Sequence, residues 1–230
     1  MAPRTLLLVR HGQASFGKSD YDRLSPGGHR QARLLGADLA RRGLRPDQIV
    51  CGSMTRHAET VAEIVVGAEW DDLETEVDAR WNELDHVDVI QAYRPAYRHN
   101  LLLKADMVRT LRPRAAFESM FEQALRRWAG GDHDGDYRES FGAFRERVDA
   151  AFDATVESTS GRTLVVTSAG CVSQIAARLT AGGSLDAWKE FALSISNTSV
   201  SRVTLGKERA RLQTFNEVGH LDAAGLVTLR

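Results

Sequence analysis

A histidine between an arginine and a glycine follows the first apolar run of the chain. The run is Thr5–Val9, and the residues after it are Arg10, His11, Gly12 and Gln13. A neutral imidazole can attack phosphorus and form a phosphohistidine, which divides one displacement into two easier ones. A guanidinium can bind two phosphoryl oxygens at once. The tripeptide therefore fits a phosphoryl-transfer site, but it equally fits a hydrogen-bonded strand-end histidine beside a surface arginine.

A second arginine, Arg56, decides between these interpretations. It follows a short predicted strand, 48–51, and stands on the first turn of a predicted helix, 55–66. We expect this strand to lie beside the first one in the sheet, so that Arg56 points toward His11. A helix N-terminus and a second guanidinium both favour a phosphate dianion. Together the two segments predict an anion site around His11.

The two segments, taken in order, resemble the histidine phosphatase superfamily, also called phosphoglycerate mutase-like. The residues that match its R-H-G strand end are Arg10, His11 and Gly12. The residues that match its S-x-x-x-R-x-x-[EQ]-T helix start are Ser53, Arg56, Glu59 and Thr60. Both halves in this order are far more specific than either half alone.

The resemblance implies a metal-independent phosphoric monoester hydrolase that needs no cofactor and works through a phosphohistidine on His11. The residues expected to bind the substrate phosphate are Arg10, Gly12, Gln13, Arg56 and Ser168. The segment 82–85 is similar to the family segment that delivers the general acid, so Glu83 becomes the candidate proton donor to the leaving oxygen. The less favoured alternative for Glu83 is an ordinary surface glutamate.

Ser168 marks a departure from the family pattern. Members normally carry a second histidine, followed by glycine, at the end of the last long strand, and this chain has Ser168 and Ala169 there. A serine hydroxyl can donate a hydrogen bond to a phosphoryl oxygen, but it carries no charge. We expect phosphate binding to persist and the rate to be the property affected. Two other histidines lie near the motifs. We expect His57 to face outward on its helix. His86, close to Glu83, is a candidate to replace part of the function of the missing second histidine.

These residues are compatible with three functions. The leading one is a phosphatase that hydrolyses a phosphomonoester through phospho-His11, with Arg10 and Arg56 holding the phosphoryl group and Glu83 protonating the leaving group. The alternative is a slow or inactive family member that binds a phosphorylated ligand, because Ser168 replaces the second histidine. A mutase is least favoured, since no residues indicate a pocket that would retain and reorient an intermediate.

The elements that must position these residues alternate between strands and helices. Apolar runs suited to buried strands alternate with amphipathic segments, and Ser25-Pro26 supplies an N-cap and a first-turn proline for a helix. This order predicts an α/β fold, a three-layer sandwich with a mostly parallel central sheet and helices on both faces. We expect one domain over 1–230, with a mainly helical insertion over the site at about 85–157.

The composition limits partners and location. The chain has 230 residues, 43% of them hydrophobic, and a formal net charge of -1. We expect a small phosphorylated substrate, no nucleic acid, and no membrane, because no apolar run approaches the roughly 18 residues of a span. The two cysteines form no C-x-x-C motif, which favours the cytoplasm. We expect no metal, since the histidines show no ligand spacing, and a homodimer is one candidate assembly.

Overall fold

The computed structural model describes residues 4–15, 22–98 and 113–229. The chain divides into two compact units, Met1–Glu83 with Val148–Arg230, and Leu84–Arg147. The smaller unit covers most of the segment that the sequence predicts as an insertion.

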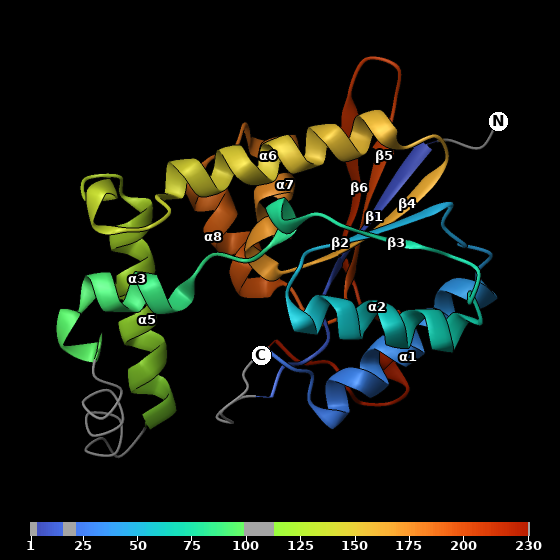
Figure 1. Cartoon of the computed structure of the whole chain (residues 1–230), viewed down its shortest axis with the longest axis horizontal. Helices are drawn as coiled ribbons and strands as arrows, with labels where there is room; N and C mark the ends of the chain where they lie inside the picture. Colours follow the sequence, from blue (N-terminus) through green and yellow to red (C-terminus); the bar gives the residue numbers. More distant parts are fainter. Residues whose placement is uncertain (1–3, 16–21, 99–112, 230) are drawn as a thin grey trace. The chain divides into compact units, whose positions relative to one another are not determined.

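A six-stranded sheet forms the centre of the larger unit (Figure 1). Its strands are β1 (Arg4–Arg10), β2 (Gln48–Cys51), β3 (Thr75–Val77), β4 (Arg162–Thr167), β5 (Val200–Leu205) and β6 (Ala210–Glu217). The order across the sheet is β3-β2-β4-β1-β5-β6. The pairings among β3, β2, β4 and β1 are parallel, whereas β5 pairs antiparallel with both β1 and β6. The predicted α/β class with a mostly parallel sheet is confirmed.

The expected adjacency of β1 and β2 is wrong, because β4 lies between them. The segment Leu164–Val166 of β4 is completely buried, as befits a strand covered on both faces. The register sets Arg10 of β1 opposite Thr167 of β4, and Cys51 of β2 opposite Val166. The carboxyl ends of all three strands therefore meet at one edge, although their order differs from the prediction.

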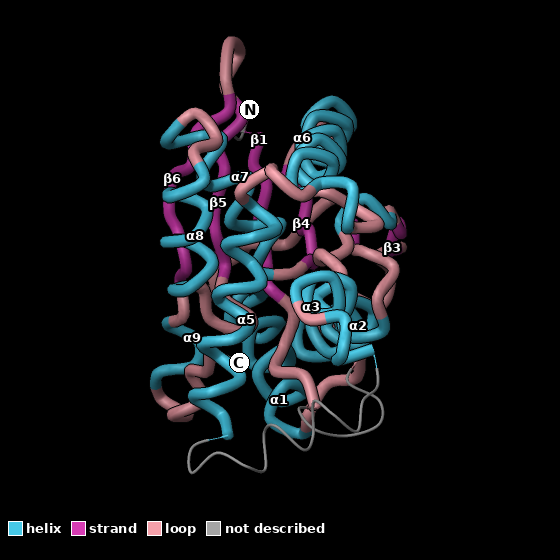
Figure 2. The backbone as a smooth tube through the Cα atoms, turned by 90° about the vertical axis from the view of Figure 1, so that its left-hand side faces the viewer, coloured by secondary structure: helices cyan, strands magenta, loops and turns pink. Residues whose placement is uncertain are grey.

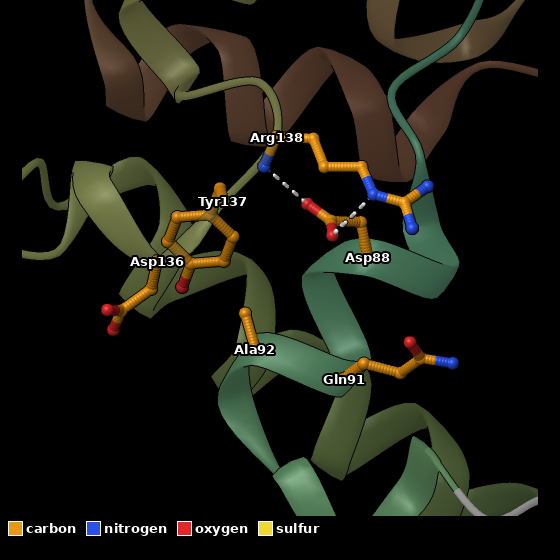
Figure 3. A pocket seen from close by; sticks show the side chains of 6 residues that line it. All are labelled: Asp88, Gln91, Ala92, Asp136, Tyr137 and Arg138. Atoms are coloured by element: carbon orange, nitrogen blue, oxygen red, sulfur yellow. Dashed lines mark hydrogen bonds and ion pairs between the residues drawn. The ribbon is translucent and has the colours of Figure 1, made fainter.

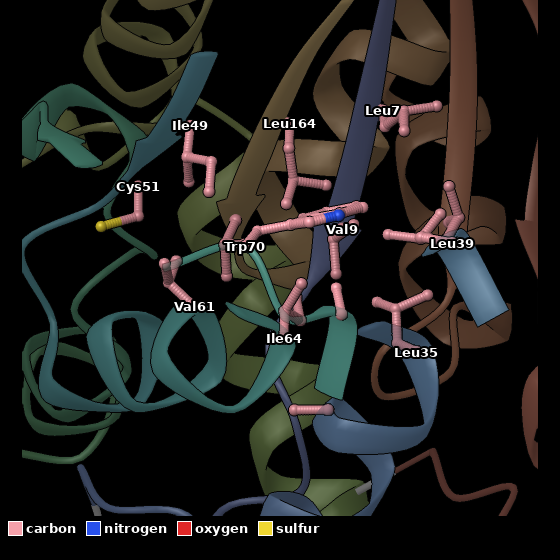
Figure 4. Close-up of a cluster of buried hydrophobic side chains, with 14 residues drawn as sticks. Leu7, Val9, Leu35, Leu39, Ile49, Cys51, Val61, Ile64, Trp70 and Leu164 are labelled. Carbon is pink, nitrogen blue, oxygen red and sulfur yellow. The ribbon is translucent and has the colours of Figure 1, made fainter. Parts of the chain in front are cut away.

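Helices cover both faces of this sheet (Figures 1 and 2). One face packs against α1 (Pro26–Arg41) and α2 (Thr55–Ala68) through a buried apolar cluster (Figure 4). The side chains labelled there include Leu7, Val9, Leu35, Ile64, Trp70 and Leu164. The opposite face carries α7 (Ala169–Ala181) and the last part of α6 (Phe141–Ser158). The larger unit thus has the three predicted layers.

The first helix begins where the sequence predicts it. Ser25 is the N-cap of α1 and its side chain accepts a hydrogen bond from the Gly28 N–H at 3.0 Å. Pro26 is the first helical residue, where its missing N–H costs nothing.

The remaining elements of the larger unit are the 3-10 helix η1 (Ala79–Trp81) and the helices α8 (Leu185–Ser194) and α9 (Gly219–Asp222).

The smaller unit is helical in the part that the structure describes. Its elements are α3 (His86–Tyr93), η2 (Pro95–Arg98), α5 (Pro113–Ala129), η3 (Asp134–Asp136) and the start of α6. Ile90, Tyr97 and Met120 form one buried cluster. Trp128 packs edge-on against Phe141, with ring centroids 5.1 Å apart.

A hollow of about 520 Å³ lies on the smaller unit (Figure 3). Its lining residues are Asp88, Gln91, Ala92, Asp136, Tyr137 and Arg138. Asp88 accepts the backbone N–H of Arg138 at 2.8 Å and pairs with its guanidinium. None of the predicted site residues lines this hollow.

None of the helices in the described residues is long and apolar enough to cross a bilayer.

Candidate active site

The loop after β1 is pressed against the start of α1. A Cβ on Gly12 would lie 2.6 Å from the Gly28 carbonyl oxygen, and one on Gly28 would lie 2.2 Å from the Gln13 carbonyl oxygen. Only glycines at both positions allow this approach. The His11 N–H donates to the Thr167 carbonyl at 2.8 Å, which continues the β1–β4 pairing by one residue. His11 is therefore fixed at the sheet edge by backbone contacts on both sides.

The partners of the His11 ring define its tautomer. Nδ1 lies 2.7 Å from the Gly12 carbonyl oxygen, which can only accept, so Nδ1 carries the proton. Nε2 lies 3.2 Å from Arg56 Nε, which can only donate, so Nε2 presents its lone pair. Nε2 is therefore the nitrogen of this ring that can act as a nucleophile.

Burial and nearby positive charge keep this ring neutral. His11 is 7% exposed. Burial, followed by the charges of Arg56 and Arg10, lowers the pKa of His11 well below its ordinary value, and the hydrogen bond to the Gly12 carbonyl opposes them weakly. At neutral pH the imidazole is therefore unprotonated, the form that can attack phosphorus.

Arg56 is buried beside His11, on the first turn of α2. Its Nη1 pairs with Asp22 Oδ1 at 2.8 Å, and the Thr55 N–H donates to Asp22 Oδ2 at 2.8 Å. Partial burial alone would raise the pKa of Asp22, but the contacts from Thr55 and Arg56 outweigh it and lower that pKa. A carboxylate thus occupies one end of the guanidinium, a contact that sequence reasoning missed.

Arg10 is anchored by the carboxyl-terminal part of the chain. Its Nη1 donates to the carbonyls of Ile195 at 2.6 Å and Leu229 at 2.8 Å. Both protons of Nη1 are used in these contacts. Its positive charge still contributes to the lowered pKa of His11, so Arg10 acts on the same site as Arg56.

Two further residues of the α2 motif tie the loops together. Thr60 Oγ1 accepts the Gly12 N–H at 3.0 Å and donates to the Arg56 carbonyl at 2.6 Å. Glu59 Oε2 accepts the Leu24 N–H at 2.8 Å. The matching positions 59 and 60 therefore serve to hold the loops that carry His11 and Asp22.

Gln13 is held at the start of α1. Its N–H donates to Gln31 Oε1 at 2.9 Å, and its Oε1 accepts the Ser25 hydroxyl at 3.0 Å. On the other side, Asn197 Nδ2 donates to the His11 carbonyl at 3.2 Å. The Thr198 N–H, in a residue with φ of 54°, donates to the Arg10 carbonyl at 3.0 Å. The segment around Asn197 thus supports the backbone of the Arg-His-Gly loop.

Glu83 lies at the N-terminus of α7. Its Oε2 accepts the Gly170 N–H at 3.0 Å, and Ser168 is the N-cap of that helix. The backbone around Ser168 is itself next to His11, because Thr167 accepts the His11 N–H. The candidate general acid is therefore attached to the same helix end as the residue that replaces the second histidine. His86 begins α3 of the smaller unit, and its role stays a prediction.

His57 faces inward, so the expectation that it faces outward is wrong. The side chain is completely buried, its Nε2 lies 2.7 Å from Ser168 Oγ, and its ring centroid lies 5.7 Å from that of His11. Burial, then the charge of Arg56, lowers the pKa of His57 to about 3. Position 57 belongs to the turn of α2 that meets β4, and the helical pattern alone does not reveal that contact.

No group of three or more metal-ligating side chains occurs in the part of the chain that the structure describes.

A family model, the histidine phosphatase superfamily (branch 1), matches residues 6–100 and 109–218. The chain belongs to this superfamily. A 2,3-bisphosphoglycerate-dependent phosphoglycerate mutase from Mesorhizobium japonicum is 36% identical over 93 residues, which are 37% of this chain and 45% of the mutase. The match thus spans less than half the length of that relative.

Solved structures share the fold over nearly the whole chain. A phosphoglycerate mutase from Bacillus anthracis superposes with a TM-score of 0.65 at 16% identity, covering 96% of both chains. A mycobacterial glucosyl-3-phosphoglycerate phosphatase superposes with a TM-score of 0.60 at 22% identity, covering 94% of this chain and 100% of the phosphatase. At these identities the likeness establishes the fold.

Proposed function

We propose that this superfamily member hydrolyses phosphomonoesters through a phosphohistidine on His11. The observation that carries the proposal is the neutral, buried ring whose Nε2 lone pair faces Arg56 while Nδ1 is held by the Gly12 carbonyl. A fixed tautomer removes the need to reorganise the nucleophile before it attacks. The substrate is a small phosphorylated molecule.

The first step transfers the phosphoryl group to the protein. The Nε2 lone pair forms a bond to phosphorus while the bond from phosphorus to the leaving oxygen breaks. Protonated Glu83 gives its proton to that oxygen. Arg56 Nε, which donates to His11 Nε2 in the structure, moves onto a phosphoryl oxygen, and Arg10 adds its charge. The Gly12 carbonyl stabilises the positive ring through Nδ1–H.

The second step releases phosphate. A water oxygen forms a bond to phosphorus while the bond from phosphorus to Nε2 breaks, and the Glu83 carboxylate takes the proton of that water. This returns His11 to its starting tautomer and Glu83 to its acid form. Arg10 and Arg56 supply the positive charge that faces the phosphoryl oxygens, which is why we propose a reaction without a metal or a cofactor.

The test is turnover of 4-nitrophenyl phosphate by the wild-type protein and by His11→Asn. We expect the substitution to abolish phosphate release without altering the unfolding transition, and the wild-type phosphoenzyme to be labile in acid and stable in alkali. His29→Gln, a change on α1 of a half-exposed side chain, is the matched control. Activity of His11→Asn within a few-fold of wild type would refute the nucleophile.

The same assay addresses the alternative function. The proteins compared above include both mutases and phosphatases, so the assay measures inorganic phosphate as well as loss of the ester. Tight binding of inorganic phosphate without any turnover that depends on His11 would favour a phospho-ligand-binding protein.

The cytoplasm stays the predicted compartment, supported by Cys51 and Cys171, which are both buried free thiols.

A further inference from the structure

Residues 226–229, which follow α9, lie against the Arg-His-Gly loop, and we refer to them as the strap. The side chains of Val227 and Leu229 are 45% and 50% exposed, and Thr228 between them is half-buried. Burial of these two apolar side chains therefore contributes little to the placement of the strap. Its position depends mainly on hydrogen bonds.

The hydroxyl of Thr228 lies between two side-chain amides. Gln31 Nε2 donates to Thr228 Oγ1 at 2.8 Å, and Thr228 Oγ1 donates to Asn197 Oδ1 at 2.9 Å. The backbone of the strap uses the same two residues, because Gln31 Nε2 also donates to the Leu226 carbonyl and the Asn197 N–H donates to the Thr228 carbonyl, both at 2.8 Å. Gln31 and Asn197 are thus the anchors of the strap.

The other ends of both amides hold the loop that carries the nucleophile. Gln31 Oε1 accepts the Gln13 N–H at 2.9 Å, and Asn197 Nδ2 donates to the His11 carbonyl at 3.2 Å. A backbone N–H only donates and a carbonyl only accepts, so these two contacts fix the orientation of each amide. The side chain at position 228 must then accept from one amide and donate to the other, which a hydroxyl does.

The strap ends on Arg10. The Leu229 carbonyl, in the residue after Thr228, accepts Arg10 Nη1 at 2.8 Å, and the Ile195 carbonyl accepts the same nitrogen at 2.6 Å. Because the guanidinium is planar and rigid, these two contacts on one nitrogen set the direction of its remaining N–H groups. Displacement of the strap would remove one of them.

We propose that Thr228 is a positioning residue for Arg10. Its hydroxyl joins the strap to the 11–13 backbone through Gln31 and Asn197, so that the Leu229 carbonyl holds the Arg10 guanidinium in the orientation that binds a phosphoryl oxygen. This inference rests on the proposed function, in which Arg10 contacts the phosphoryl group, and deepens it.

A double-mutant cycle on phosphate affinity tests this coupling. The dissociation constant of inorganic phosphate is measured by titration calorimetry for the wild type, Thr228→Val, Arg10→Ala and the double variant. Thr228→Val keeps the shape of the side chain and removes both of its hydrogen bonds, so we expect it to raise the dissociation constant about ten-fold. In the Arg10→Ala background the same change should alter affinity less than about two-fold, because its target is gone.

A conservative variant and a matched control separate positioning from loss of a threonine as such. Thr228→Ser keeps a hydroxyl that both donates and accepts, so we expect phosphate affinity within about two-fold of wild type. Thr204→Val removes the hydroxyl of another half-buried threonine, which donates to Gln213 Oε1 at 3.1 Å and pairs with Thr5 at the opposite end of β1 from Arg10. We expect this control to bind phosphate like the wild type. Thr228→Ala replaces Thr228→Val in the cycle if the valine variant does not fold.

Three results would overturn the proposal. Wild-type phosphate affinity in Thr228→Val would show that the hydroxyl does not affect the site. An equal loss of affinity in the presence and absence of Arg10 would show that Thr228 does not act through it. A Thr228→Ser variant as weak as Thr228→Val would assign the effect to the methyl group.

Failure of the proposed function is recognised separately. In that case the wild type would show no turnover of 4-nitrophenyl phosphate that depends on His11. The phosphate titration needs no turnover, so it would still decide whether Thr228 acts through Arg10.

Discussion

Arg56 Nε lies 3.2 Å from His11 Nε2 and donates to it. The contact joins the two residues that a phosphoryl group would have to touch first, and it requires His11 to be neutral. Both side chains are buried, so the pair is screened from water and its electrostatic interaction is strengthened. Protonation of His11 would set two positive groups against each other in this enclosed place.

Stability should therefore fall as the pH decreases below about 6.5. Burial is the largest cause that lowers the pKa of His11 well below its ordinary value, of His57 to about 3 and of His220 to about 4. The unfolded chain binds protons at these histidines near pH 6.5 and the folded protein does not. Each group then removes up to about 1.4 kcal/mol per pH unit from the free energy of unfolding.

Denaturant unfolding at pH 7.5, 6.0 and 5.5 measures this slope. These contributions are fully present above the unfolded pKa of histidine and are lost as the pH falls toward the folded values. His57→Gln should reduce the slope by about one group's share, whereas Ser173→Ala, which removes a completely buried hydroxyl of α7 that does not titrate in this range, should leave it unchanged. A free energy of unfolding that is constant from pH 7.5 to 5.5 would contradict the buried neutral state of these rings.

Asp22 should compete with phosphate for Arg56. Its Oδ1 pairs with Arg56 Nη1 at 2.8 Å, and an ion pair with one partly exposed partner has a net worth of up to about 1 kcal/mol. Asp22→Asn removes the negative charge but keeps an oxygen that can accept the Thr55 N–H. We expect inorganic phosphate to inhibit this variant about five-fold more strongly than the wild type. Weaker inhibition would mean that Asp22 mainly holds Arg56 in place.

Glu83 should matter most for poor leaving groups. Its carboxylate lies against the Gly170 N–H, and a general acid contributes in proportion to the basicity of the oxygen that it protonates. We expect Glu83→Gln to lower turnover of an alkyl phosphate by about 100-fold or more, and that of 4-nitrophenyl phosphate by clearly less. Equal losses on both substrates would indicate that Glu83 only fixes the start of α7.

Gly12 should be irreplaceable for packing as well as for the site. A Cβ there would lie 2.6 Å from the Gly28 carbonyl oxygen, which is backbone and has little room to move. We expect Gly12→Ala to lower the free energy of unfolding by about 1–3 kcal/mol. Gly219→Ala, where a Cβ would meet no atom within 4 Å, is the matched control. Denaturant unfolding of the two variants at neutral pH measures the difference, and equal midpoints would show that the loop relaxes without cost.

The sequence by itself determined the elements and the chemical groups at their ends. Three local patterns could be recognised in the sequence: the apolar run before Arg10, the Ser25-Pro26 start of α1, and the arginine on the first turn of α2. They are local because strand and helix periodicity and helix capping depend on residues that are close together in the chain. These patterns were sufficient to predict an anion site at one edge of an α/β sheet.

Only the tertiary structure decided which groups meet there. The strand that separates β1 from β2 comes from more than 100 residues later in the chain, because its fully apolar segment is most stable in the covered centre of the sheet. The central position of β4 places the backbone before Ser168 against His11. It also brings Ser168 into contact with His57, which faces inward. Asp22 likewise reaches Arg56 through a loop contact. Such long-range pairs depend on which surfaces pack together, and no local spacing in the sequence encodes them.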